Sequence, residues 1–350
     1  MARGQEMAET PLVFHSLLKD VSRSFYLTLR VLPARIRAQI GLAYLLARTT
    51  DTIADTELVP LAKRLQALQA LRERILGQSQ GSLDYGELAR NQASPSERVL
   101  LGKCDTSLAL LHSFSKADIQ LIQTVLDIIT SGQELDLRRF GEASKDQIIA
   151  LQTDDELDDY TYRVAGCVGE FWTRMCRAHL FPNAQIDDEA LLAKGVRLGK
   201  GLQFVNILRD LPKDLRQGRC YLPVERISPL GLKPDDLLQP ENEPRLRPLY
   251  HEYLDRAEVH LRAGWEYTNM LAFRQCRVRL ACAWPILIGM RTLQLLRTGN
   301  VLDPEHRIKV SRAEVKRIML RSALFYAAPP LWKKLVPTET SRNQTSERAA

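Results

Sequence analysis

Almost every segment of this chain with a clear hydrophobic period repeats every three to four residues, as an α-helix does. Pro33 begins one such stretch, in which Ile36 and Ile40 fall on one face, and Pro60 begins the next. No alternating apolar and polar run, and no Asn-Gly turn, indicates a β-hairpin. The sequence therefore predicts an all-α protein.

The same periodicity predicts a series of further helices separated by loops. We expect these helices over residues 96–112, 115–140, 146–180, 187–211, 245–272, 276–298 and 311–327. Residues 77–95 are loop-like, and a connector rich in proline and glycine runs from Pro212 to Pro244. No change of composition and no repeat divides the chain. We therefore expect one domain over residues 11–330, between a flexible N-terminus (1–10) and a polar, disordered tail (331–350).

Two acidic pairs share one spacing: Asp51 with Asp55, and Asp210 with Asp214. On a helix, side chains four residues apart lie on one face, with Cβ atoms ~5–6 Å apart. Like charges at this spacing destabilise an isolated helix by about 0.2–0.5 kcal/mol, so two such pairs indicate that a cation is bound near them. Carboxylate oxygens suit Mg²⁺, which is commonly shared with the phosphates of a substrate. The pattern predicts a diphosphate held by magnesium between two helices.

The formal net charge of +7 favours anionic partners such as diphosphates, acidic lipid surfaces or nucleic acid. Nucleic acid is the weakest of these interpretations, because no stripe of Lys and Arg and no recognised binding motif is present. The six cysteines contain no Cys-x-x-Cys pair, which indicates reduced thiols and argues against a zinc site. The six histidines have no spacing typical of metal ligands.

Localisation signals are absent from the sequence as it stands. Residues 1–6 lack the apolar core of a signal peptide. No apolar run reaches the ~18–20 residues that a bilayer crossing needs, and the nearest one, Cys282 to Leu296, contains Pro285 and Arg291. We expect a cytoplasmic protein without a transmembrane anchor, and peripheral contact with a membrane stays open.

Two smaller patterns each have two interpretations. Glycines lie inside helical stretches and indicate either close helix–helix contact or room for a long apolar ligand: Gly166, Gly169, Gly195, Gly199 and Gly201. A basic cluster of Arg274, Arg277 and Arg279 is typical of a solvated face, although a phosphate-bearing cofactor or an acidic membrane surface could use it.

Five motifs follow one another along the chain: Ser22 to Tyr26 (SRSFY), Tyr44 to Asp55 (YLLARTTDTIAD), Tyr160 to Gly169 (YTYRVAGCVG), Gly201 to Asp214 (GLQFVNILRDLPKD) and Arg216 to Pro223 (RQGRCYLP). In this order they closely resemble the squalene/phytoene synthase family, the head-to-head prenyl-diphosphate synthases, over residues 15 to 320. A lone Asp-x-x-x-Asp is a weak signal, whereas the fourth motif followed by the fifth is specific. Without a membrane anchor, the chain most resembles the soluble bacterial squalene synthases.

The resemblance implies an isoprenoid-synthase fold, a single helical domain around a central apolar tunnel with one acidic motif at each side of its mouth. It also implies roles for residues that match the family's motifs. Mg²⁺ would be held by Asp51, Asp55, Asp210 and Asp214, while diphosphate would be bound by Ser22, Ser24, Arg48, Gln203, Asn206 and Arg209. Tyr160 matches a tyrosine considered for proton handling near the departing diphosphate.

Each of these residues also has a plainer interpretation. Arg48 and Arg209 could simply neutralise the neighbouring acids as surface ion pairs, which contribute ~0–1 kcal/mol. Tyr160 could be an ordinary core tyrosine with a satisfied hydroxyl. Ser22 and Ser24 could be helix caps.

The resemblance implies an enzyme that transfers prenyl groups and joins two farnesyl diphosphates through presqualene diphosphate. NADPH would then reduce this intermediate to squalene, a precursor in sterol or hopanoid biosynthesis. The Asp-Thr-x-x-Asp form of the first motif favours this branch, and so does the segment from Arg307 to Arg312, which looks like part of the C-terminal helix pair of squalene synthases.

Two positions depart from the pattern of squalene synthases: Thr56 stands where an acid often follows the first motif, and Ala281 stands where an aromatic is common. No Gly-x-Gly-x-x-Gly fingerprint supports a nicotinamide site either, although members of the family bind NADPH without one. The alternatives are a synthase that yields presqualene diphosphate, dehydrosqualene or phytoene without reduction, and a non-catalytic assembly or lipid-binding factor of the same fold.

Overall fold

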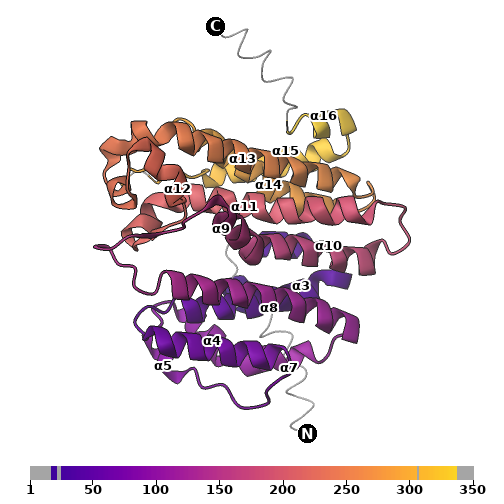
Figure 1. Cartoon of the computed structure of the whole chain (residues 1–350). Helices are drawn as coiled ribbons and strands as arrows, with labels where there is room; N and C mark the ends of the chain where they lie inside the picture. The colour runs from indigo at the N-terminus through magenta and orange to yellow at the C-terminus, as the bar shows by residue number, and fades with distance from the viewer. Residues whose placement is uncertain (1–16, 22–24, 306, 337–350) are drawn as a thin grey trace. The chain divides into compact units, whose positions relative to one another are not determined.

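A computed structural model describes residues 17–21, 25–305 and 307–336, which are almost entirely helical (Figure 1). The prediction of an all-α protein is confirmed. The chain forms two compact units. The first contains the residues up to Ala143 together with Tyr162–Ala184, and the second contains Ser144–Thr161 and the residues from Gln185 onward. The expectation of one domain over residues 11–330 stays a prediction, as does the tunnel.

The first unit is built around two long helices, α3 and α8, which pack against each other. Its elements are α2 (Phe25–Val31), α3 (Ala34–Ala54), α4 (Leu61–Ile75), α5 (Gly86–Asn91), α6 (Pro95–Gly102), α7 (Cys104–Leu111), α8 (Lys116–Arg139), the π-helix η1 (Tyr162–Gly166) and α10 (Cys167–Leu180). The helix α3 contributes fully buried leucines, and α8 adds Ile122 and Leu126 to the core. This apolar contact fixes the end of α3, where the first acidic pair lies.

In the second unit, the long helices α11, α13 and α14 pack against one another (Figure 1). Its elements are β1 (Ile149–Ala150), α9 (Asp154–Thr161), α11 (Asp188–Arg216), β2 (Arg219–Cys220), α12 (Val224–Ile227), three short 3₁₀ turns η2 (Ser228–Leu230), η3 (Pro234–Leu238) and η4 (Pro240–Asn242), then α13 (Glu243–Met270), α14 (Cys276–Leu296), α15 (Arg312–Tyr326) and α16 (Pro329–Lys333). A Cβ on Gly201 would lie 2.9 Å from the Cβ of His260, so at this glycine the expected close helix contact is confirmed.

The expected helix over residues 146–180 is interrupted. Its first residues form β1, which pairs in parallel with β2 of the connector, and the π-helix η1 separates α9 from α10. Gly218 makes this pairing feasible because its φ is 78° and a Cβ there would lie 2.4 Å from the backbone of Ser144. The glycine of the fifth motif is therefore required by backbone geometry.

The helix α11 runs through Pro212 and ends at Arg216, so the expectation that it ends at residue 211 was wrong. Proline has no N–H, so the carbonyl oxygen of Leu208 loses its helical partner. The hydroxyl of Tyr250 donates to that oxygen over 2.9 Å instead. This bond from α13 satisfies a buried carbonyl, and the helix continues through the second acidic pair.

The ends of the chain differ from expectation on one point. Residues 331–336 were assigned to a polar tail, but α16 ends at Lys333 and the side chain of Trp332 is buried against Trp265. The N-terminal residues 1–10 and the remaining tail, 337–350, lie outside the described residues. A short helix, α5, also occupies part of the expected loop over 77–95.

Candidate active site

The first acidic pair lies at the C-terminal end of α3. Asp51 is in its last turn, and Asp55 caps the helix through a bond from its backbone N–H to the Asp51 carbonyl, 2.8 Å long. The two residues are therefore in helical register, as the spacing predicted. The Asp55 side chain is exposed, whereas that of Asp51 is 45% exposed.

The surroundings of Asp51 disfavour the ionised form of its carboxyl group. Burial, followed by the negative charge of Asp55, raises the pKa of Asp51 to about 6, while Arg48 and a hydrogen bond from Gln133 act in the opposite direction. Because the Asp51 side chain keeps part of its exposure, solvent moderates the effect of burial. The repulsion from Asp55 acts in the same direction, so at Asp51 burial and negative charge outweigh the nearby Arg48.

Two other helices hold side chains against this pair. Gln133 of α8 donates a hydrogen bond to the Asp51 carboxylate, and its own amide oxygen is buried without a partner. Arg48 forms an ion pair with Glu97 of α6 and lies 3.8 Å from Asp51. Arg48 thus pairs mainly with Glu97, a partner that the sequence did not suggest, and only distantly with the neighbouring Asp51, while its role toward diphosphate stays a prediction.

The second acidic pair lies on α11 in a different electrostatic setting. Arg209 contacts both oxygens of Asp210, at 3.1 and 2.5 Å, and Arg307 lies 3.2 Å from Oδ1. Burial alone would raise the pKa of Asp210, but the two guanidinium groups outweigh it and lower that pKa. Asp214 follows one turn later and is partly exposed.

Two amides precede this pair on the same helix. The side chain of Asn206 is exposed and donates to the Gln203 side chain over 3.3 Å. They lie four and seven residues before Asp210, so all three fall on one helical face. The face therefore combines carboxylate and amide oxygens, which are suitable ligands for a hard cation.

Tyr160 lies on α9 beside the fifth motif. Its ring stacks on that of Tyr221, with centroids 4.6 Å apart and an angle of 25° between the rings. The backbone of the connector is fixed at the same place, since the amide of Leu151 donates to the carbonyl of Cys220 over 3.0 Å. The partly exposed Tyr160 is thus held by the Arg-x-Gly-Arg-x-Tyr-Leu-Pro segment, and its role in proton handling stays a prediction.

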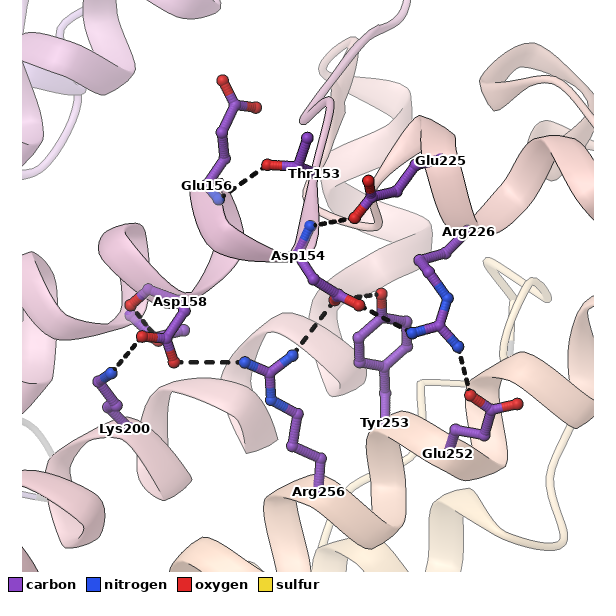
Figure 2. A network of polar contacts seen from close by, with 11 residues as sticks. Thr153, Asp154, Glu156, Asp158, Lys200, Glu225, Arg226, Glu252, Tyr253 and Arg256 are labelled. Atoms are coloured by element: carbon purple, nitrogen blue, oxygen red, sulfur yellow. Dashed lines mark hydrogen bonds and ion pairs between the residues drawn. The ribbon is translucent and has the colours of Figure 1, made fainter.

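A network of charged side chains fixes α9 within the second unit (Figure 2). Asp154 accepts hydrogen bonds from Tyr253 (2.8 Å), Arg226 (2.8 Å) and Arg256 (3.2 Å). One turn later, Asp158 accepts from Arg256 (3.2 Å) and Lys200 (2.6 Å). The helix that carries Tyr160 is therefore bound to α11, α12 and α13 through two of its own carboxylates.

The expected site residues fall into separate groups. Arg48, Asp51 and Asp55 belong to the first unit, and each is described only within it. The second unit contains the other expected residues that the structure describes: Tyr160, Gln203, Asn206, Arg209, Asp210 and Asp214. Ser22 and Ser24 lie outside the described residues.

Sequence reasoning missed Gln133 and Glu97 as neighbours of the first motif, and Arg307 as a neighbour of the second. Arg307 lay in a segment that the resemblance singled out, but nothing near it in the sequence linked it to Asp210. Gln133 and Glu97 carried no signal in the sequence.

Magnesium suits the residues present, although the described part of the chain contains no cluster of three or more His, Cys, Asp or Glu side chains arranged as a metal site. Asp51 and Asp55 are hard oxygen ligands one turn apart, and because burial and the charge of Asp55 raise the pKa of Asp51, a bound cation would favour its ionised form. The unpartnered amide oxygen of Gln133 adds a buried acceptor beside them.

Comparison with known proteins identifies the family. Residues 18–314 match the sequence profile described as squalene/phytoene synthase, and the chain belongs to this family of prenyl-transferring synthases. A bifunctional lycopene cyclase/phytoene synthase of Gibberella fujikuroi is 32% identical over 252 residues, which is 69% of this chain and 40% of that protein. The squalene synthase of Schizosaccharomyces pombe is 26% identical over 314 residues, 88% of this chain and 64% of that protein. The chain thus spans less than two thirds of the length of these relatives.

Solved structures share the fold. TcSQS in complex with the ligand E5700 aligns with a TM-score of 0.75 at 22% identity, covering 93% of this chain and 90% of that one. The squalene synthase HpnC from Alicyclobacillus acidocaldarius gives a TM-score of 0.61 at 19% identity, covering 84% and 95%. The isoprenoid-synthase fold expected from the motifs is confirmed.

Proposed function

We propose that this protein is a squalene synthase. It joins two molecules of farnesyl diphosphate head to head through presqualene diphosphate, in a reaction that requires Mg²⁺, and reduces the intermediate to squalene with NADPH. One observation carries the proposal: both acidic pairs are intact and in helical register, and α11 keeps that register through Pro212. A family member that had lost catalysis would have no need to retain four such carboxylates.

The two acidic pairs have complementary tasks in this proposal. Asp51 and Asp55 bind magnesium in this account, and so do Asp210 and Asp214. Bound Mg²⁺ supplies charge neutralisation for the departing diphosphate. Arg48 and Arg209 add fixed donors for the oxygens on which negative charge accumulates, and such preorganised donors lower the barrier to ionisation. Gln203 and Asn206 complete the polar shell.

Tyr160 handles a proton near the leaving diphosphate in this account. Its ring is fixed by stacking on Tyr221, and its helix is fixed by Asp154 and Asp158. A phenol held in one place can serve a proton transfer without a reorganisation of the chain. The allylic cation left after ionisation must be shielded from water, and the apolar tunnel implied by the family serves that purpose.

A second candidate is a synthase that releases presqualene diphosphate, dehydrosqualene or phytoene without reduction. Two observations favour it: the relative at 32% identity is a bifunctional phytoene synthase, and Ala281, which is buried, stands where an aromatic is common in squalene synthases. The two candidates share the head-to-head condensation and differ in the use of NADPH and, for phytoene, in the chain length of the substrate.

The shared metal step is tested by Asp51→Asn and Asp210→Asn. Each change keeps the size of the side chain and removes a ligand charge, so we expect turnover of farnesyl diphosphate to fall by at least about a hundredfold, with unchanged helical circular dichroism. EDTA should stop the wild-type reaction and added Mg²⁺ should restore it. Asp105→Asn, an exposed carboxylate outside both motifs, is the matched control and should keep full activity. Near-normal turnover of both motif variants would refute the metal site.

A further inference from the structure

The helix α15 has an unusual outer face. Leu320 and Leu324 are 64% and 65% exposed and lie one turn apart. The side chains beside them on the same face are Lys316, Arg317 and Arg321, all exposed. Exposed leucines normally occur singly, so two leucines flanked by three cations on one helical face require an explanation. We name these five residues the α15 outer face.

The opposite side of α15 is the side that packs onto the unit. The Nε1 of Trp284 in α14 donates to Ser322 Oγ over 3.1 Å, and both Ser322 and Tyr326 are buried. Leu320 and Leu324 each lie two residues from one of these, about 200° around the helix. The leucines therefore point away from the core and contribute nothing to it.

A cluster of aromatic side chains around Arg279 packs against the end of this helix. The guanidinium of Arg279 lies 5.3 Å from the ring centroids of both Tyr326 and Trp332, and it donates to Asn269 over 2.7 Å. Arg279 is buried, so the expectation that it belongs to a solvated face was wrong, whereas Arg274 and Arg277 are exposed as expected. The aromatic cluster around Arg279 holds the end of α15 in place.

Positive charge is concentrated around this helix. Residues 271–280 and 312–336 together contain nine Lys and Arg and a single acid, Glu314, a net charge of +8 against +7 for the whole chain. The rest of the chain is therefore close to neutral. Glu314 is already engaged with Arg291 and with the cap at Ser311. No acidic side chain lies on the α15 outer face itself.

From this arrangement we propose that the α15 outer face docks the protein onto a bilayer that contains anionic lipids. The two leucines enter the boundary between headgroups and acyl chains, and the cations contact lipid phosphates on either side of them. Contact of this face with a second copy is disfavoured, because a twofold interface would place the three cations of each copy against those of the other. The described part of the chain has no helix long and apolar enough to cross a bilayer, and docking of this kind needs none.

This surface stands independently of the proposed function, although the two agree. A synthase that releases a C30 hydrocarbon would deliver it next to the membrane in which such a product dissolves. The proposal concerns only the described surface of α15 and involves none of the residues assigned to metal or diphosphate.

The test is co-sedimentation of the purified full chain with vesicles of phosphatidylcholine alone or mixed with phosphatidylglycerol. We expect binding to the mixed vesicles only, weakening as salt is raised. The triple variant Lys316→Gln/Arg317→Gln/Arg321→Gln should bind roughly a hundredfold more weakly. The double variant Leu320→Ser/Leu324→Ser should lose about tenfold or more. Because all five side chains are exposed, circular dichroism should be unchanged.

Two controls remove exposed side chains of the same character elsewhere on the protein. Lys103→Gln/Lys116→Gln/Lys145→Gln removes three exposed cations elsewhere, and Leu58→Ser removes an exposed leucine elsewhere; both should bind as the wild type does. The proposal is overturned if the wild type ignores mixed vesicles, if the lysine control loses as much binding as the α15 variant, or if the leucine variant binds normally. It is equally overturned if light scattering shows an oligomer that the α15 variants dissolve, since the face would then be a protein interface.

Discussion

At the scale of single residues, the second acidic pair depends on a hydrogen bond made by Tyr250. Pro212, which lies between Asp210 and Asp214, cannot donate a helical hydrogen bond to the Leu208 carbonyl, and the Tyr250 hydroxyl compensates by donating to that oxygen. Both Leu208 and Tyr250 are buried, so water cannot take over this bond. The register of two proposed metal ligands is thus set by a residue that would not touch the metal.

We predict that Tyr250→Phe lowers the free energy of unfolding by about 1–3 kcal/mol, because it leaves a buried carbonyl without a donor. The loss of stability caused by Tyr250→Phe should be smaller in a Pro212→Ala background, where residue 212 regains an N–H that can donate to the Leu208 carbonyl. Urea denaturation of the four proteins in this double-mutant cycle measures the coupling. Pro285→Ala, a proline inside α14, is the control background and should leave the cost unchanged. If Tyr250→Phe destabilised the protein equally in all backgrounds, the Tyr250 hydroxyl would not be replacing the hydrogen bond that Pro212 removes.

His260 introduces a pH dependence of stability. Burial, followed by the charges of Arg197, Arg256 and Lys200, lowers the pKa of His260 from its ordinary value of 6.5 to about 4, and Asp158 opposes this only in part. Its Nδ1 is buried without a hydrogen-bond partner. The folded protein therefore disfavours the imidazolium, whereas the unfolded chain accepts the proton near pH 6.5.

Between pH 6.5 and 4 the unfolded state binds more protons at this site than the folded state does. The contribution of neutral His260 to stability is therefore complete above pH 6.5 and is lost as the pH falls. The free energy of unfolding of the wild type should fall between pH 6.5 and pH 4. We predict that His260→Gln reduces this fall by on the order of 1–3 kcal/mol. The measurement is the free energy of unfolding of wild type and variant across that window. His112→Gln, an exposed histidine of the first unit, should leave the slope as it is. A variant with the wild-type slope would contradict the assignment.

At the scale of elements, α9 is held by ionic contacts more than by apolar ones. Only Leu157 and Thr161 of this short helix are buried, while Asp154 and Asp158 bind four donors on three other helices (Figure 2). A helix of this length is marginal without tertiary contacts. The position of Tyr160 therefore depends on this charged network.

We predict that Asp154→Asn destabilises the protein by about 1–3 kcal/mol, because Tyr253, Arg226 and Arg256 lose a charged acceptor. Amide hydrogen exchange, measured by mass spectrometry, should accelerate in α9 more than in α13. Glu252→Gln is the matched control: Glu252 is 63% exposed and pairs only with Arg226 among the residues of this network. Its effect should stay within about 0.5 kcal/mol. Exchange in α9 that equals the wild type in Asp154→Asn would refute the role of the network.

The same elements show what the sequence alone could establish. The helices around both acidic pairs were predictable because periodicity and the spacing of four are local properties. The end of α11 was not, because a local rule stops a helix at Pro212, while the bond that preserves it comes from a residue 42 positions away. Gln133 and Arg307 lie 82 and 97 positions from the carboxylates that they contact. Such neighbours follow from tertiary structure and leave no pattern in one sequence.

At the scale of the whole molecule, the family and the acidic motifs support the proposed condensation of prenyl diphosphates, and the α15 outer face adds a proposed location for it. In the first unit the pKa of Asp51 is raised although Arg48 lies nearby, whereas in the second unit two arginines lower the pKa of Asp210. This asymmetry predicts that magnesium is needed most at Asp51 and Asp55.

The most direct test of this account is a product analysis. Purified protein receives farnesyl diphosphate and Mg²⁺, with and without NADPH, and the extracted lipids are identified by mass spectrometry, with geranylgeranyl diphosphate as the alternative substrate. The account predicts squalene when NADPH is present and no squalene when it is absent. Presqualene diphosphate or dehydrosqualene regardless of NADPH, or phytoene from the longer substrate, would contradict the reductive step and support the second candidate. The absence of any condensed product from either substrate would contradict the proposed function itself.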